Sequence, residues 1–389
     1  MKAAVTARIP VTVLTGYLGA GKTTLLNRIL GGDHGRRYAV IVNEFGEIGI
    51  DSDLIVHSDE ELFEMNNGCV CCTVRGDLIR TLHGLLHRRS DDGSGEHNPF
   101  DAIIVETTGL ADPGPVAQTF FVDAFLQSRT RLDSVTTLVD ARHIGLRLGD
   151  SREAAEQIAF ADQIVLNKTD LVSESELQTL EARLHRLNPF APIHRAQRAD
   201  VALDQVLGRG GFDLDRIVSL EPQFLAPAHG EAGHVHDAHC GHGAGAESHG
   251  DGEGQGSLSE PVQAHDQAPQ GPVRAHGPEL DPVHDHVHDA QIQSVSLQSP
   301  RPMDAAAVSR WLEVLLAAQG ADILRAKGIV NVQGEDRRMV FQSVHMLLEG
   351  DWQREWRADE PRASRLVFIG RHLDAQALRA GFEACAAGD

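Results

Sequence analysis

Apolar residues along the chain fall into two kinds of segment, short continuous runs and longer stretches with helical periodicity. The short runs predict strands, which lie at residues 11–15, 38–43, 102–105, 134–139 and 163–166. The runs at 38–43 and 102–105 have the pattern of strands buried on both faces, and residues 192–196 are strand-like. The periodic stretches place an apolar residue every three or four positions, as helices do; they lie at residues 20–30, 73–86, 152–161 and 174–187. Because strands alternate with helices, we predict an α/β fold with a mostly parallel, doubly wound sheet.

The composition changes sharply after this first region. Gly, Pro, His and acidic residues dominate from about residue 227 to 290, and Arg274 is the single basic residue there. Such a segment buries too little apolar surface to order itself. Alternating and periodic patterns then resume, with strands expected at 291–298, 329–332, 338–344 and 366–369 and helices at 303–318 and 374–386. We therefore predict an α/β domain at 1–221, a disordered linker at 222–290 and a small α+β domain at 291–389.

The first predicted strand runs directly into a glycine-rich loop. Residues 16–23 match G-x-x-x-x-G-K-[ST] between a strand and a helix, the context that a phosphate-binding P-loop needs. Its glycines permit a tight turn, and the amides at the start of the helix form an anion site. Lys22 would reach the β- and γ-phosphates, and the Thr23 hydroxyl would ligate Mg²⁺. The predicted nucleotide-binding residues of this loop are Gly16, Gly19, Ala20, Gly21, Lys22, Thr23 and Thr24.

A second motif, NKTD at residues 167–170, follows the predicted strand at 163–166. A carboxylate at this place can accept hydrogen bonds from N1 and the exocyclic amine of guanine together, which adenine does not offer. A lone NKxD tetrapeptide is a weak signal, but it follows a late strand of a P-loop domain here. We therefore predict that Asn167, Lys168 and Asp170 make the site specific for guanine and that the nucleotide is GTP.

Glu106 ends the predicted strand at 102–105, where P-loop enzymes place an acidic residue near Mg²⁺ or the attacking water. Gly109, three residues further on, could offer its amide to the γ-phosphate and act as a switch. The alternative is a helix N-cap with a solvated glutamate. We predict Lys22, Thr23 and Glu106 as the catalytic set. The neighbouring Asp112, Asp123 and Asp140 are interpreted as helix caps or solvated acids.

Three of the five cysteines lie within four positions, as C-x-C-C at Cys69, Cys71 and Cys72. Thiolates this close can supply two or three ligands to Zn²⁺, Co²⁺ or Cu⁺. A redox pair and buried inert thiols are the alternatives, although the spacing differs from the C-x-x-C of thioredoxin-like motifs. The linker adds His229, His234, His236, His239, Cys240, His242, His249, His265, His276, His284, His286 and His288. Such a tract either binds metal at many weak sites or is a polar tether.

Composition narrows the function classes further. The formal net charge is -21, whereas a nucleic-acid binder usually presents a basic face. The sequence contains no run of about 18 apolar residues, the length that a spanning helix needs. The odd, clustered cysteines do not form a disulfide framework, so we expect reduced thiols and a cytoplasmic protein that binds neither nucleic acid nor membrane.

Taken together, these motifs resemble the CobW-like family of P-loop GTPases, which handle transition metals. The resemblance rests on GYLGAGKTT, NEFGEIGID, CVCC, ETTG and NKTD in one order, and on RAKGIV, FQSVHML and RLVFIGRHLD in the last hundred residues. It implies a GTPase domain joined to a CobW-type C-terminal domain, and a metal site on the C-x-C-C thiols controlled by the nucleotide. It also implies that Glu44 matches a family acid that can join the cysteines as a metal ligand.

The resulting hypothesis is a GTP-dependent metallochaperone that passes Zn²⁺ to a client metalloprotein when GTP is hydrolysed. Two alternatives stay open from the sequence. The first is a GTPase that delivers Co²⁺ for cobalamin synthesis, with a cobalt chelatase as its client. The second is a His-rich metal store that uses GTP only as a conformational clamp. A nucleotide-dependent dimer, the client and the physiological metal are not decided by these motifs.

Overall fold

The structure, a computed structural model, describes residues 8–32, 35–44, 61–66, 72–87, 100–212, 292–358 and 360–388. The predicted linker at 222–290 with its histidine tract, the loop at 45–51, Cys69 and Cys71 lie outside these residues. The described parts of the α/β domain and of the C-terminal domain belong to one compact unit.

The first domain is built on a parallel sheet of seven strands in the order β3-β2-β4-β1-β5-β6-β7. The strands are β1 (Ile9–Gly16), β2 (Tyr38–Glu44), β3 (Glu61–Asn66), β4 (Ala102–Glu106), β5 (Thr130–Asp140), β6 (Gln163–Asn167) and β7 (Ile193–Arg195). Each pairing in this sheet is parallel, which confirms the predicted α/β class. The loops that follow these strands therefore open at one edge of the sheet, where ligands bind in such folds.

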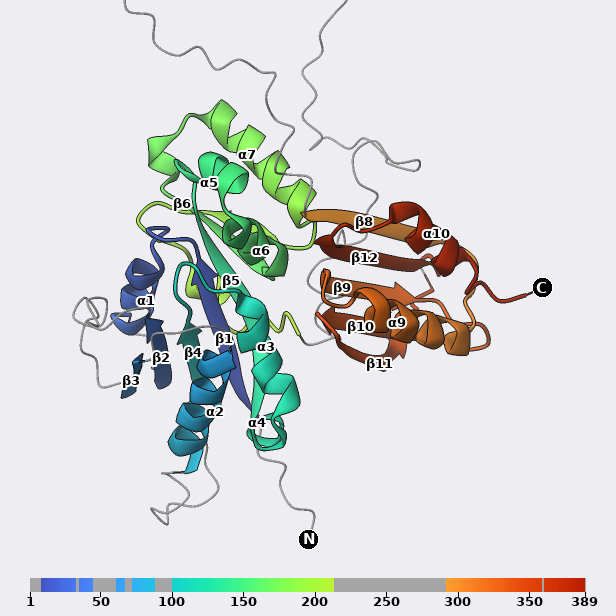
Figure 1. Cartoon of the computed structure of the whole chain (residues 1–389), viewed down its shortest axis with the longest axis horizontal. Helices are drawn as coiled ribbons and strands as arrows, with labels where there is room; N and C mark the ends of the chain where they lie inside the picture. Colours follow the sequence, from blue (N-terminus) through green and yellow to red (C-terminus); the bar gives the residue numbers. More distant parts are fainter. Residues whose placement is uncertain are drawn as a thin grey trace, which may run out of the picture. The chain divides into compact units, whose positions relative to one another are not determined.

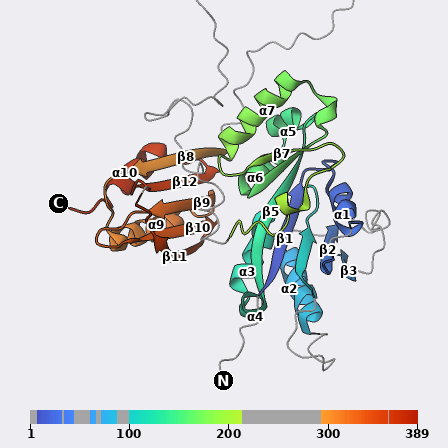
Figure 2. The same ribbon diagram turned by 180° about the vertical axis from the view of Figure 1, so that it is seen from behind.

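Helices cover both faces of this sheet (Figures 1 and 2). They are α1 (Lys22–Leu30), α2 (Cys72–His87), α3 (Pro113–Val122), α4 (Ala124–Arg129), α5 (Ile144–Asp150), α6 (Arg152–Phe160) and α7 (Glu174–Leu187), with short 3-10 turns at Thr169–Leu171 and Leu203–Gln205. Along β2 the buried residues alternate between two cores: Val40 packs with Leu26 of α1, whereas Ile41 packs with the core that contains Leu82 of α2. The sheet is therefore doubly wound, as predicted.

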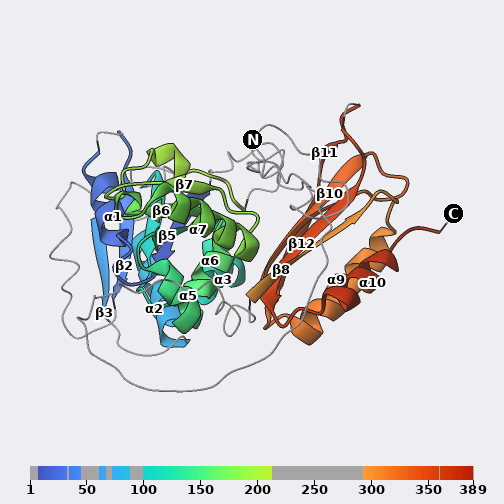
Figure 3. The same ribbon diagram turned by 90° about the horizontal axis from the view of Figure 1, so that it is seen from above.

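The C-terminal domain has an antiparallel sheet of five strands in the order β11-β10-β9-β12-β8. Its elements are β8 (Ile292–Ser299), α9 (Ala305–Gln319), β9 (Ile323–Val330), β10 (Arg337–Val344), β11 (Leu347–Glu355), β12 (Ser364–Arg371) and α10 (Ala375–Glu383). Leu312 of α9 and Phe382 of α10 pack against Phe341 and Phe368 of the sheet, so both helices cover the same face (Figure 3). This arrangement confirms the predicted α+β class.

Several elements were absent from the sequence prediction, each for a local reason. β11 is an edge strand whose residues are mostly exposed and polar, so it lacks an apolar pattern. α3 begins with two prolines, at Pro113 and Pro115, which resembles a loop in sequence. The first of them is nevertheless well placed, because proline is favoured in the first turn of a helix.

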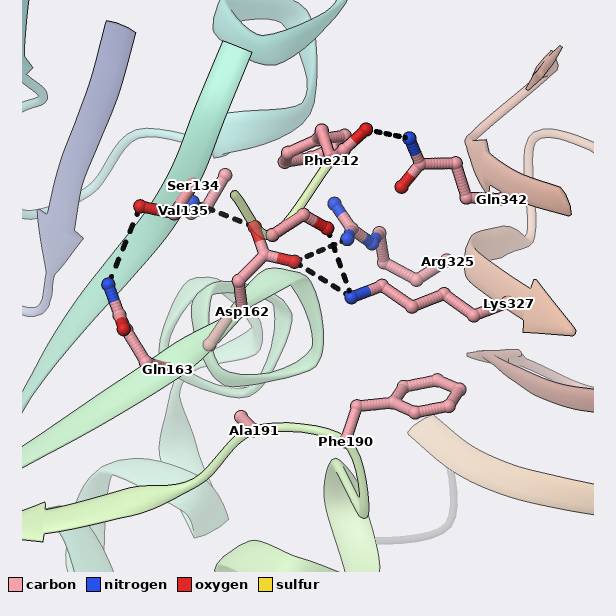
Figure 4. Close-up of polar contacts among 12 residues, drawn as sticks. Ser134, Val135, Asp162, Gln163, Phe190, Ala191, Phe212, Arg325, Lys327 and Gln342 are labelled. Carbon is pink, nitrogen blue, oxygen red and sulfur yellow. Dashed lines mark hydrogen bonds and ion pairs between the residues drawn. The ribbon is translucent and has the colours of Figure 1, made fainter. Parts of the chain in front are cut away.

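A buried charge cluster joins the two domains (Figure 4). Asp162, directly before β6, accepts hydrogen bonds from Arg325 Nη2 at 2.5 Å and from Lys327 Nζ at 3.0 Å, both on β9. The guanidinium of Arg325 also stacks on the ring of Phe212 at 4.3 Å from its centroid. Burial lowers the pKa of Arg325, which is 1% exposed. The face of the C-terminal sheet opposite its helices is therefore an interface with the first domain.

Candidate nucleotide and metal site

The glycine-rich loop between β1 and α1 has the backbone geometry that a P-loop requires. Gly16 and Gly21 have φ angles of 138° and 109°, a region that favours glycine. A Cβ atom on Gly16 would lie 2.3 Å from the carbonyl oxygen of Leu138, and one on Gly21 would lie 2.5 Å from Nδ2 of Asn167. Side chains are therefore excluded at both positions by geometry.

Lys22 is the first residue of α1, and its side chain turns back over the loop. Its Nζ donates to the carbonyl oxygen of Gly16 at 2.8 Å, and the residue is only 9% exposed. Thr23 and Thr24 follow in the first turn, half-buried and exposed respectively, and Ala20 is buried in front of them. The first turn contains no acidic residue, so the helix start keeps the positive character that suits an anion.

Asn167 of the NKTD motif ties two loops together. Its Nδ2 donates to the carbonyl oxygen of Ala20 in the P-loop at 2.9 Å, and its Oδ1 accepts from the amide of Ala199 at 2.8 Å. The residue is 2% exposed. Asp170, three positions further, lies exposed in a 3-10 turn, where its carboxylate is accessible to a base. The arrangement suits a base beside the P-loop, and guanine specificity stays a prediction.

Asp140, at the end of β5, is a hydrogen-bond partner of the NKTD lysine, whereas the sequence suggested only a helix cap or a solvated acid. Lys168 has a left-handed backbone, with φ at 61°, and its Nζ donates to Asp140 Oδ2 at 2.7 Å. The same oxygen lies 3.0 Å from Nδ1 of His143. Burial works to raise the pKa of Asp140, but the hydrogen bonds from Lys168 and His143 hold it below its usual value. The signal for this role was the position of Asp140 at the carboxyl end of a strand.

The two other acids interpreted as caps are helix caps. Asp112 accepts from the amide of Gly114 at the start of α3, at 2.8 Å. Asp123 accepts from the amide of Leu126 at the start of α4, at 2.9 Å. Each satisfies a backbone donor that a helix start leaves without an intrahelical partner.

The loop after β4 lies directly against the P-loop. The amide of Thr107 donates to the carbonyl oxygen of Leu14 at 2.9 Å, and its hydroxyl donates to the hydroxyl oxygen Oγ1 of Thr15, also at 2.9 Å. A Cβ atom on Gly109 would lie 2.6 Å from Cδ2 of Leu18 in the P-loop. Glu106, which ends β4, is 4% exposed and therefore is not a solvated side chain.

A cavity of about 420 Å³ lies beside the tip of the P-loop. It is lined by Tyr17, Leu18, Gly19, Thr137, Leu138, Val139, Asp140, His143, Ile144, Arg147, Ala154, Gln157, Ile158 and Lys168. The guanidinium of Arg147, on α5, lies 5.7 Å from the centroid of the Tyr17 ring. The lining of the cavity therefore includes the cationic side chains of Arg147 and Lys168 as well as apolar ones.

Of the predicted metal ligands, the structure describes the backbone of Glu44 and Cys72. Glu44 is the last residue of β2 and stands opposite Asn66, the last residue of β3, in their parallel register. β3 leads towards the C-x-C-C motif, and Cys72 is the first residue of α2. The structure does not describe the side chains of Glu44 and Cys72. Within the described ranges, no group of three or more His, Cys, Asp or Glu side chains could hold a metal ion.

A parallel sheet with a P-loop after β1, an acid-bearing loop after β4 and NKTD after β6 defines the class: this is a P-loop nucleotide-binding domain with a second, antiparallel domain. Family models identify it further. The CobW/HypB/UreG nucleotide-binding domain matches residues 10–195, and the Cobalamin synthesis protein cobW C-terminal domain matches residues 292–386. The chain belongs to the CobW family, and it is a GTPase.

Relatives match over almost the whole chain. The zinc chaperone YjiA of Escherichia coli is 35% identical over 375 residues, which is 96% of this chain and 98% of the relative. The zinc chaperone CobW of a Sinorhizobium species is 30% identical, with 97% of each chain covered. The crystal structure of Zn(II)-bound YjiA GTPase from E. coli superposes with a TM-score of 0.66 at 30% identity, covering 98% of this chain and all of that one. No helix in the part of the chain that the structure describes is long and apolar enough to cross a membrane.

Proposed function

We propose that this protein is a GTP-hydrolysing metallochaperone that binds Zn²⁺ at the C-x-C-C motif and passes it to a client protein when GTP is hydrolysed. The observation that carries the proposal is the shared edge of the parallel sheet. β1 leads into the P-loop, β4 into the loop after Glu106, and β2 ends at Glu44 beside the end of β3. A change at the γ-phosphate would therefore occur at the same edge of the sheet as Glu44, the predicted metal ligand that ends β2.

The P-loop residues fit a nucleoside triphosphate with Mg²⁺. The backbone cradle at Gly16 and Gly21 has no room for a Cβ atom, and the buried Lys22 ammonium lies over it. Thr23 would hold Mg²⁺ through its hydroxyl, and the ion when bound would neutralise charge on the phosphate oxygens. Lys22 supplies a fixed positive charge towards the β- and γ-phosphates, which stabilises the negative charge that develops during transfer.

Glu106 is proposed to orient the attacking water. Its carboxylate lies at the end of β4 next to the P-loop strand, and it can accept a hydrogen bond from the water while a water lone pair faces phosphorus. The backbone amide of Gly109 is proposed to donate to a γ-phosphate oxygen. Loss of the γ-phosphate then removes one contact of this loop. GTPases switch in this way, because loops that the γ-phosphate orders are released on hydrolysis.

Zn²⁺ is the cargo of this cycle. The thiolates of Cys69, Cys71 and Cys72 with the carboxylate of Glu44 form a four-ligand set of the chemistry that zinc prefers. GTP is proposed to order the loops that carry these ligands. Hydrolysis relaxes the loops, weakens the metal site and allows transfer to a docked client.

The relatives support zinc as the metal. Two are named zinc chaperones, and a third is named zinc-regulated GTPase metalloprotein activator 1, from Schizosaccharomyces pombe. A form of YjiA in which one glutamate and two cysteines are replaced by alanine is also Zn(II)-bound in its crystal structure. Zinc content alone is therefore a poor test of the C-x-C-C site, because that relative binds zinc even without one glutamate and two cysteines.

The proposal is tested by coupling between nucleotide and zinc affinity. Zinc affinity is measured by competition with a chelator in the presence of GTP, a non-hydrolysable GTP analogue and GDP. We expect the analogue form of the wild-type chain to hold zinc more tightly than the GDP form. Cys71→Ala should abolish this difference, and Lys22→Ala should abolish both the difference and GTP hydrolysis. Cys385→Ala is the matched control, because Cys385 is buried in the C-terminal domain.

A zinc affinity that is equal with GTP analogue and GDP would refute the coupling. The same titration with Co²⁺ distinguishes a zinc chaperone from a GTPase that delivers cobalt for cobalamin synthesis. In a cobalt chaperone, the difference in metal affinity between the GTP-analogue and GDP forms should be larger for Co²⁺ than for Zn²⁺. Turnover should be slow without a client, because the sequence offers no obvious arginine finger.

A further inference from the structure

Gln157, on α6, forms hydrogen bonds with the loop that follows Glu106. Its side-chain Nε2 donates to the carbonyl oxygens of Gly109 and Ala111, at 3.1 and 3.0 Å. The residue is 1% exposed, so these hydrogen bonds are shielded from water. The loop is anchored at its beginning by Thr107 on the P-loop strand, and Gln157 holds its middle. The position of Gly109 relative to the P-loop therefore depends on α6.

The neighbouring residue of α6 is tied to the C-terminal domain. Glu156 pairs with Arg371 at the end of β12, and their side chains are 7% and 12% exposed. Arg371 also donates to the carbonyl oxygen of Ala321 at 3.0 Å, which fixes the guanidinium within its own domain. Adjacent residues of one helix thus contact the loop and the second domain.

His345 makes a second contact between the C-terminal domain and the same region. It follows β10 in a left-handed conformation, with φ at 51°, and its ring centroid lies 5.0 Å from that of Phe160 on α6. A Cβ atom on Gly114, near the start of α3, would lie 2.5 Å from Nε2 of His345. The C-terminal domain therefore packs against α6 and against the helix start that ends the loop.

We propose that Gln157 is a positioning residue for GTP hydrolysis, and that the C-terminal domain sets its position through Arg371 and His345. This rests on the proposed roles of Glu106 and Gly109. The loop between β4 and α3 is held from one side by Gln157 and from the other by the start of α3. A shift of the C-terminal domain moves both supports together. The domain therefore controls hydrolysis without supplying a group to the nucleotide.

The first experiment measures kcat for GTP hydrolysis at saturating GTP, together with GDP affinity, for the full chain with Gln157→Ala. Loss of two hydrogen bonds that position the loop should lower kcat by about tenfold. GDP affinity should be unchanged, because the loop is proposed to contact the γ-phosphate alone. A merely structural role would instead lower GDP affinity and thermal stability together, with kcat per folded molecule unchanged, and that result overturns the proposal.

Glu106→Gln distinguishes a failure of the positioning role of Gln157 from a failure of the proposed function. If Glu106→Gln abolishes turnover and Gln157→Ala keeps the wild-type kcat, the positioning role is wrong while the proposed function stands. If Glu106→Gln itself turns over normally, the proposed function of this loop fails.

The link to the C-terminal domain is tested by Arg371→Gln, alone and combined with Gln157→Ala. Alone it should lower kcat by about threefold, and in the Gln157→Ala background it should have no further effect, because coupled residues are non-additive. Arg362→Gln is the matched control, since Arg362 pairs with Asp336 at the surface of the same domain. Additive losses, or an equal loss in the control, overturn the link.

Discussion

Replacing Asp162 with alanine should break the interface between the two domains. Asp162 is the carboxylate that faces Arg325 and Lys327, and the three residues are 7%, 1% and 6% exposed (Figure 4). Its Oδ2 also accepts from the amide of Val135 at 2.8 Å. The substitution therefore leaves two cations buried at the interface and one backbone donor without its acceptor.

The magnitude follows from what each loss costs. Removing one partner of a buried ion pair costs about 3–5 kcal/mol, because the remaining charge stays desolvated. The lost hydrogen bond to Val135 adds about 1 kcal/mol. Stacking on Phe212 is present in both the wild type and the variant, so it does not enter this difference. We expect a loss of about 4–6 kcal/mol, which cannot exceed the docking free energy of the domains, because undocking returns both cations to water.

The three tryptophans report this change separately from the rest of the chain. Trp311 lies on α9, Trp352 lies on β11 and Trp356 follows that strand, so tryptophan fluorescence reports on the C-terminal domain, whereas far-UV circular dichroism reports on both domains. In urea, the wild-type transitions should coincide, and Asp162→Ala should move the fluorescence midpoint below the dichroism midpoint.

Two comparison variants make the result decisive. Asp162→Asn keeps an acceptor for Val135 and removes the charge, so it should lose most of the same stability. Asp336→Ala breaks an exposed ion pair with Arg362, whose side chain is 48% exposed, and should cost less than about 1 kcal/mol. If both Asp162 variants stay within about 1 kcal/mol of wild type, the charge cluster does not hold the domains together and the reasoning is wrong.

Three further outcomes follow from the structure. Asp140→Asn removes the carboxylate that pairs with the NKTD lysine and should weaken GDP and GTP binding alike by about tenfold in an equilibrium titration. Burial lowers the pKa of His345 from its usual value of 6.5, so this residue is protonated at higher pH in the unfolded chain than in the folded chain. Thermal stability should therefore fall as pH drops through about 6.5, and His345→Asn should reduce that fall. Gly21→Ala should abolish nucleotide binding because its Cβ atom would meet the NKTD asparagine. Gly208 also has a positive φ, at 65°, but open space around its Cβ position, so Gly208→Ala should only lower stability.

The prediction of the candidate nucleotide site rests mostly on local motifs. The P-loop and NKTD are runs of consecutive residues, and each occurs where a strand ends, so the pattern of the strands also placed the motifs at one edge of the sheet. The geometry at Gly16 and Asn167 agrees with that placement. The strands predicted in the first domain lie within four residues of the observed ones for the same reason, since burial on both faces leaves a continuous signal. In the C-terminal domain the prediction at 329–332 was displaced, because β9 is Ile323–Val330.

The supporting residues were not predictable, because their partners are distant in sequence. Asp140 is 28 positions from Lys168, and Gln157 is 48 positions from Gly109. A glutamine on a helix has no motif, and its function arises only once α6 packs beside the loop. The edge strand β11 was not predicted for another reason. It is mostly exposed, so no apolar pattern marks it.

β9 shows most clearly why an interface is hidden from sequence analysis. Arg325 and Lys327 alternate with Leu324, Ala326 and Gly328, which is the pattern of a strand with one face in water. Both cations are buried in the structure, because Asp162 of the other domain provides the opposite charge. A polar face of a strand is the same in sequence whether water or a complementary domain covers it. The distinction depends on a carboxylate more than 160 residues away, and it becomes visible only when the two sheets are placed together.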